Sequence, residues 1–82
     1  MISTQIIANC IEELKQITKV DLAVFGIDGT LVTATFETDY ITENLIKGFA
    51  NSPADSQVIG RDHLLRVLDE GELLYILVAS GE

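Results

Sequence analysis

The stretch "FGIDGTLV", Phe25 to Val32, is where the sequence comes nearest to a catalytic motif. Phosphatases with an aspartate nucleophile carry Asp-x-Asp-Gly-Thr-Leu after a buried strand, and the first carboxylate attacks phosphorus. Here Asp28 and Gly29 match, but Gly26 stands at the position of the nucleophile. Such a site also needs a cluster of metal-binding carboxylates. The sequence therefore does not support a phosphatase, and Asp28–Gly29 instead predicts a type I′ turn that closes a β-hairpin.

Arg61, His63 and Arg66 form the second group that could do chemistry. Arginine, histidine and backbone amides are the groups that recognise the carboxylates of a small acid. In a regular strand Arg61 and His63 share one face while Arg66 lies on the other, because successive side chains alternate. Ser56 and Gln57 could add hydrogen bonds at the mouth of a pocket. These five residues are the candidate ligand site.

Each of these residues also has an ordinary structural interpretation. The arginines can pair with neighbouring carboxylates on a solvated edge, and those neighbours are Asp62, Asp69 and Glu70. A single histidine at a strand start suits a half-buried surface position. Ser56 and Gln57 equally suit a polar turn. The sequence leaves both interpretations open.

The other acidic and nucleophilic residues form no recognised catalytic or metal-binding pattern. Asp69, Glu70 and Glu72 lack the Asp-x-Asp-x-Asp-Gly order of a calcium loop, so no metal site is predicted. The chain has one histidine and one cysteine, Cys10, and no credible pair of nucleophile and base. The sequence predicts a protein that is not an enzyme and has no cofactor.

The composition predicts one small domain. Its 82 residues are 48% hydrophobic, which supports a modest core. A formal net charge of −8, from 13 acidic and 5 basic residues, disfavours binding to nucleic acid or an anionic membrane. The longest apolar run, Leu73 to Ala79, is far shorter than the ~20 residues of a membrane-spanning helix. Without a recognisable signal peptide, and with Cys10 at an apolar helical position, we expect a soluble cytoplasmic protein.

The spacing of apolar residues predicts two helices. From Thr4 to Lys19 they recur at steps of three and four, which indicates an amphipathic helix capped by Ser3 or Thr4. A second helix is predicted to begin near Thr38 or Asp39 and to end before Pro53. Its buried side comprises Ile41, Leu45, Ile46 and Phe49.

Four strands are predicted around these helices. Residues 20–27 and 30–36 flank the Asp-Gly turn, and residues 63–68 and 73–79 flank a loop in which Gly71 supplies a left-handed conformation. Residues 54–62 are predicted to be a polar connection. The resulting order, αββαββ, favours an α+β fold in which an antiparallel sheet carries its helices on one face.

The last predicted strand is apolar on both faces apart from the hydroxyl of Tyr75, so both faces require cover. Two helices on one face cannot supply it. We therefore expect either a partner subunit or a C-terminal helix absent from this chain to cover the strand. The predicted interface consists of Leu73, Leu74, Tyr75, Ile76, Leu77 and Val78.

Two stretches resemble a known family: "IIANCIEELKQITKVDLAVFGIDGTLVTATFE" and "FANSPADSQVIGRDHLLRVLDEGELLYILVASGE". Together they are similar to the N-terminal sensor region of bacterial transcription regulators of the carbohydrate diacid regulator (CdaR/PucR) type. The resemblance spans essentially the whole chain. It implies a two-layer PAS/GAF-like (profilin-like) domain over residues 1–82, from the N-terminal part of a longer regulator that binds DNA through a separate C-terminal domain.

The resemblance implies a function as well as a fold. We expect a non-enzymatic domain that senses a small molecule and dimerises, with a sugar acid or related carboxylate as the ligand and a homodimer as the working form. The alternative is a roadblock-like or degenerate PAS-like module that pairs subunits without a ligand. No binding motif of the family maps onto positions of this chain, so the candidate ligand residues rest on their chemistry alone.

Overall fold

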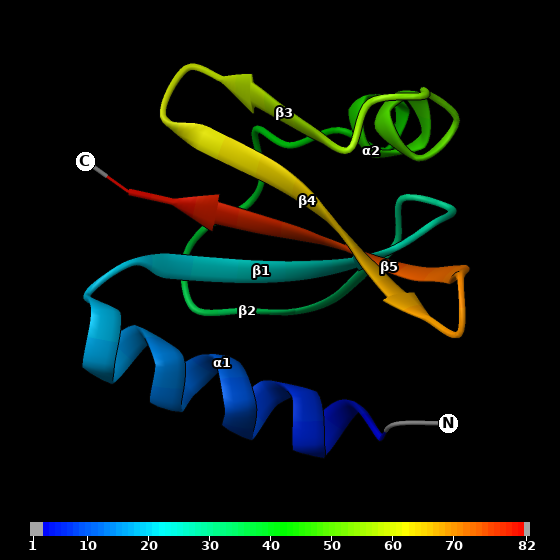
Figure 1. Cartoon of the computed structure of the whole chain (residues 1–82). Helices are drawn as coiled ribbons and strands as arrows, with labels where there is room; N and C mark the ends of the chain where they lie inside the picture. The colour runs from blue at the N-terminus through cyan, green and yellow to red at the C-terminus, as the bar shows by residue number, and fades with distance from the viewer. Residues whose placement is uncertain (1–2, 82) are drawn as a thin grey trace.

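The protein is a five-stranded antiparallel sheet with one helix on each face, as a computed structural model shows for residues 3–81 (Figure 1). The strand order is β2-β1-β5-β4-β3, which makes β5 the central strand. The elements are α1 (Thr4–Thr18), β1 (Asp21–Gly26), β2 (Leu31–Ala34), α2 (Glu43–Ala50), β3 (Ser56–Ile59), β4 (Asp62–Asp69) and β5 (Glu72–Ser80). The α+β class and the antiparallel sheet are confirmed, and both are compatible with a PAS/GAF-like fold. Within the described residues, neither helix is long and apolar enough to cross a membrane.

The predicted order αββαββ is wrong by one strand. Residues 56–59, assigned to a polar connection, form β3, which pairs with β4 from Ser56↔Leu65 to Ile59↔Asp62. A two-residue turn joins the two strands, and its first residue, Gly60, has the positive φ of +61° that a tight hairpin turn accepts from glycine. Apolar spacing does not predict this strand, because its four residues are all exposed and burial imposes no alternation of apolar and polar side chains.

The β1–β2 hairpin is confirmed, but its turn is not type I′. The loop spans residues 27–30, and Gly29 has a φ of +91° whereas Asp28 is not among the described residues with positive φ. Asp28 instead acts through its side chain, because Oδ1 accepts a hydrogen bond from the Thr30 amide at 3.0 Å. A two-residue turn with positive φ at both positions occurs between β4 and β5, at Glu70 (+52°) and Gly71 (+81°).

Both helices have the caps that their sequences favour, although α2 starts later than predicted. The Ser3 hydroxyl accepts from the Ile6 amide at 3.2 Å, and Lys19 ends α1 in the left-handed conformation. Helix α2 begins at Glu43 and not near Thr38 or Asp39, since the Thr42 hydroxyl accepts from the Leu45 amide at 3.1 Å.

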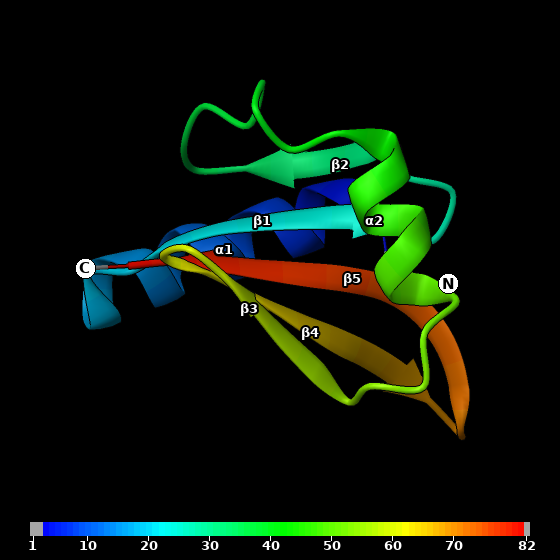
Figure 2. The ribbon, with the colours of Figure 1, turned by 90° about the horizontal axis from the view of Figure 1, so that it is seen from above.

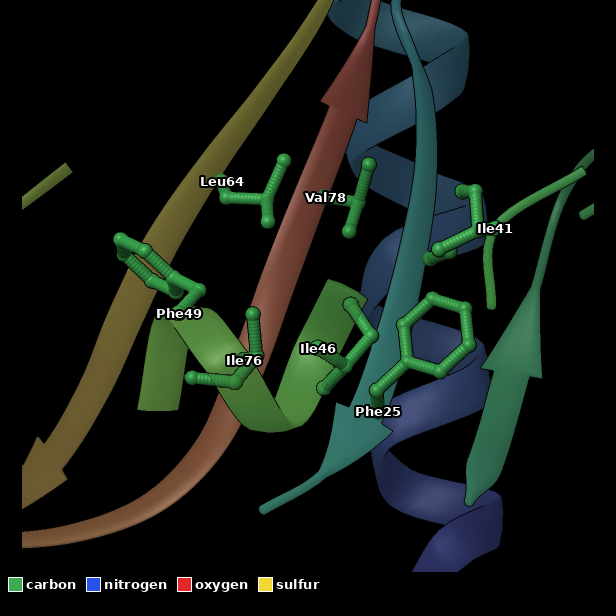
Figure 3. Close-up of a cluster of buried hydrophobic side chains, with 8 residues drawn as sticks. Phe25, Ile41, Ile46, Phe49, Leu64, Ile76 and Val78 are labelled. Carbon is green, nitrogen blue, oxygen red and sulfur yellow. The ribbon is translucent and has the colours of Figure 1, made fainter. Parts of the chain in front are cut away.

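The prediction that both helices lie on one face, in two layers, is wrong: the sheet lies between them. Helix α2 buries Ile46 and Phe49 against Phe25, Ile76 and other side chains of one face (Figure 3). Helix α1 packs Ile11 against Leu22 and Val24 of the other face. Figures 1 and 2 together place the two helices on opposite sides of β1. Adjacent residues of one strand point to opposite faces, so strands that are apolar throughout favour a helix on each face.

Candidate functional site

The most distinctive surface of the molecule is an apolar groove beside α1. Helix α1 lies against β1 and β2, at one side of the sheet, and within residues 3–81 no element covers β4 and β3 on that face. The groove has a volume of about 270 Å³, and none of the described residues that line it is charged. Its lining comprises Ile6, Ile7, Cys10, Ile11, Leu14, Val24, Val67, Tyr75 and Leu77.

The wall of the groove is an apolar stripe on α1, beside the apolar residues with which this helix packs on the sheet. Ile7 and Ile11 pack on the sheet, whereas Ile6 and Leu14 remain 62% and 42% exposed. Cys10 lies between them in sequence and is also exposed, although its helical position places it among apolar residues. The stripe therefore extends the apolar surface of α1 sideways, beyond what the sheet covers.

The floor of the groove continues across β4. Leu65 pairs with Leu77 and Val67 pairs with Tyr75, so these four side chains point to the α1 face. Leu65 is 38% exposed and Val58, farther out on β3, is exposed as well. We call the α1-face surface of β5, β4 and β3 the open half-sheet.

The predicted interface on β5 divides between the two faces. Ile76 and Val78 are fully buried in the core beneath α2, so they do not lie on any surface of the folded chain (Figure 3). Tyr75 and Leu77 point to the opposite face and line the groove. Leu73 packs against the α2-side core, and Leu74 is partly buried. The groove residues on β4 were not among the predicted contacts, because only the register shows which of them adjoin Leu77 and Tyr75.

The cationic candidates do not come together as one site. Arg61 and His63 line a common depression with Val20, Gly60, Ala79 and Gly81 at one end of the sheet. His63 points to the α1 face, because it pairs with Ala79, and Arg66 points to the α2 face, because it pairs with Ile76. The predicted separation of Arg66 from His63 is therefore confirmed.

Arg66 is engaged in holding the end of α2. Its guanidinium donates to the Phe49 carbonyl oxygen at 2.9 Å, to Ala50 at 3.3 Å and to Ala54 at 2.7 Å, and it also donates to the Ser52 carbonyl. The same group lies 4.7 Å from the centre of the Phe49 ring. The last carbonyls of a helix have no partner within the helix, so this arginine satisfies them. A ligand carboxylate would have to displace these bonds, which argues against a ligand role for Arg66.

Ser56 and Gln57 lie on the edge strand β3, and both are exposed. They are not among the residues that line the depression at Arg61 and His63. Ser56 pairs with Leu65 and Gln57 pairs with Leu64, so their side chains point to different faces of the sheet. The structure therefore does not bring them together with the cationic candidates.

The polar contacts of this domain connect one element to another. Lys15 of α1 forms an ion pair with Asp21 of β1, and the Thr35 hydroxyl donates to the same Asp21 oxygen at 3.1 Å. Lys15 and then Thr35 hold the pKa of the Asp21 carboxyl below its usual value. The Thr30 amide likewise lowers the pKa of Asp28. Burial raises the pKa of the Tyr40 phenol, which donates to the Asp62 carboxylate at 3.2 Å.

No family model, curated protein or solved structure matches this chain. Among the described residues, no three side chains of histidine, cysteine, aspartate or glutamate gather as metal ligands do. The groove itself offers contact area without a charged or catalytic group, and apolar contact area of this kind is suited to binding another apolar surface.

Proposed function

We propose that this domain is a non-catalytic module that pairs subunits through its open half-sheet and the adjoining stripe of α1. The observation that supports this proposal is the apolar groove beside α1, in which Leu14, Tyr75 and Leu77 remain accessible. A soluble domain rarely leaves a continuous apolar surface of this kind uncovered, and such surfaces mark sites of interaction.

The partner we propose is a second copy of the chain. At a formal net charge of −8, two copies repel each other at long range, so the surface through which they meet must add no further charge. The groove meets that condition, because its lining carries no charge. A partner selected by charge would be basic and would bind an acidic surface of the domain, away from the groove.

The test of this function is the oligomeric state of the protein over a range of concentrations, measured by sedimentation velocity. We expect the protein to dimerise at micromolar concentration, and Leu65→Glu to raise the dimer Kd by about a hundredfold, since it places a charge in an apolar contact. Ile27→Glu is the control, because Ile27 is also exposed but lies in the β1–β2 loop. A protein that stays monomeric at hundreds of micromolar would contradict the proposal.

A second candidate function is the sensing of a sugar acid or related carboxylate by a domain of a transcription regulator. The observation in its favour is that Arg61 and His63 line the same depression. A thermal-shift screen against sugar diacids and hydroxy acids tests it, because a ligand at a hundred times its Kd adds about 2.7 kcal/mol to the free energy of unfolding. A saturable rise in melting temperature that Arg61→Ala abolishes would support this function. If no compound of the screen raises the melting temperature, that result would count against it.

A further inference from the structure

The groove has a floor and one wall that meet at an angle. A molecule that fills the groove must present apolar surface to both. The floor is the open half-sheet, with Leu65 and Leu77 near its centre. The wall is the stripe of α1, with Ile6, Cys10 and Leu14. An isolated flat surface would contact only the floor, so the occupant must also present an edge to α1.

A second open half-sheet has the required shape. Sheets that pack face to face lie about 10 Å apart, which is also the usual distance between a helix axis and the sheet beneath it. A second sheet on the floor would therefore lie level with α1 and meet its stripe with an edge strand. The three strands of the open half-sheet end in such an edge, because β3 is the outermost strand.

We infer that two copies pack open half-sheet on open half-sheet, with α1 of each copy lying along the β3 edge of the other. This arrangement rests on the proposed pairing function and specifies its geometry. The α1 stripe would cover Val58, which is 59% exposed on β3. It would also cover a sheet edge whose unpaired backbone groups otherwise invite aggregation. The same contact thus covers the floor, the stripe and the edge.

The symmetry of this contact places β4 on the twofold axis. Each α1 can lie beside the partner's β3 only if the axis runs along the strands, midway between the two sheets. Because β4 is the middle strand of β5, β4 and β3, it would face its own copy. Leu65, at the middle of β4 on the α1 face, would then lie opposite Leu65 of the second copy.

The same axis brings like charges to the same end of the dimer. An axis along the strands does not exchange the two ends of a strand, so both β4–β5 hairpins lie at one end. Each of these hairpins carries Asp69, Glu70 and Glu72. Raising the salt concentration should therefore tighten the dimer by screening their repulsion.

Cross-linking at Leu65 tests the geometry separately from the pairing itself. In the Cys10→Ser background, we expect Leu65→Cys to form a disulfide-linked dimer on mild oxidation, at least tenfold faster than Gln57→Cys. Gln57 is the matched control, since it lies on the neighbouring strand and points to the other face. A wild-type dimer in which Leu65→Cys is no faster than Gln57→Cys would overturn the inference and leave the pairing function standing. A monomeric wild-type protein would overturn both.

Charge reversal provides a second readout that does not depend on thiol chemistry. We expect Glu72→Lys to lower the dimer Kd about fivefold at low salt, because it removes repulsion between the two hairpins. Glu12→Lys changes the net charge equally on an exposed turn of α1 and should lower the Kd less than twofold. Equal effects of the two variants would show that only net charge matters and would overturn the placement of the hairpins. Circular dichroism confirms that each variant folds.

Discussion

The two faces of the sheet are built from the same strands but are closed to different degrees. On the α2 face, Phe49, Ile46, Ile76, Val78 and Leu64 are fully buried, and Arg66 fixes the end of the helix. On the α1 face, Ile11, Leu22 and Val24 are the buried side chains among residues 3–81, and the groove remains open beside them. Figure 2 shows α2 lying across β1 and β5 near the end of β1, whereas α1 runs behind β1 on the other face.

This difference indicates a division of roles between the faces. The α2 face supplies most of the folding free energy, because it buries the larger apolar side chains. The α1 face keeps apolar surface accessible, which costs stability in the isolated chain but provides a surface for association. Substitutions on the two faces should therefore affect different measurements.

The largest effect on stability is expected from a cavity on the α2 face of the sheet. Phe49→Ala should lower the free energy of unfolding by about 3 to 5 kcal/mol, because it leaves a cavity between α2 and the sheet. Leu14→Ala on the open face should lower it by less than about 1 kcal/mol, since Leu14 is already half exposed. Urea denaturation of both variants measures the difference, at protein concentrations low enough for the monomer to predominate. Equal losses would mean that the faces contribute equally to folding.

The next largest effect is expected for the hydrogen bonds that Arg66 donates to the end of α2. Arg66→Ala should cost about 2 to 3 kcal/mol, because it leaves the last carbonyls of α2 without their charged donor. Arg66→Lys should recover only part of this loss, since one ammonium cannot reach carbonyls that the guanidinium fork spans. Denaturation midpoints check this prediction, and full recovery by lysine would show that charge alone is sufficient.

A smaller effect is expected at the glycine that packs against the start of α2. Gly29→Ala should cost about 2 kcal/mol, because φ is +91° and a Cβ atom would lie 2.8 Å from Cα of Glu43. Gly71→Ala is the matched control, with a similar φ of +81° but open space around the Cβ position. It should cost about 1 kcal/mol. If the two variants melt at the same temperature, the contact with α2 contributes nothing.

The smallest effect is a pH dependence of stability that involves Asp28 and the ion pair between Lys15 of α1 and Asp21 of β1. The folded-state pKa values of Asp21 and Asp28 lie below their usual values, so the unfolded chain binds protons more readily than the folded one. Their stabilisation is complete above pH about 4 and is lost as the pH falls through the folded-state values. Asp21→Asn should reduce this acid-dependent loss in urea titrations between pH 6 and 2.5. An unchanged profile would assign the loss to other carboxylates.

Local sequence patterns predicted most of the elements but not their packing. Helix α1, the β1–β2 and β4–β5 hairpins, and the buried side of α2 follow from periodicity and turn residues. Strand β3 could not be predicted in this way, because its pairing with β4 is decided by a register that apolar spacing does not encode in an exposed strand. Charge makes Arg61, His63 and Arg66 candidates for binding a carboxylate, but charge alone does not show that Arg66 bonds the carbonyls of α2.

An acidic α+β domain with two amphipathic helices and a last strand that is apolar on both faces follows from the amino-acid sequence alone. Those are local properties, set by the order of apolar and polar residues along each segment. Three features appear only in the folded chain: this strand is central, the helices lie on opposite faces, and α1 leaves β4 and β3 uncovered. These features depend on contacts between residues far apart in the chain, where several packings bury the same apolar side chains and their shapes decide among them.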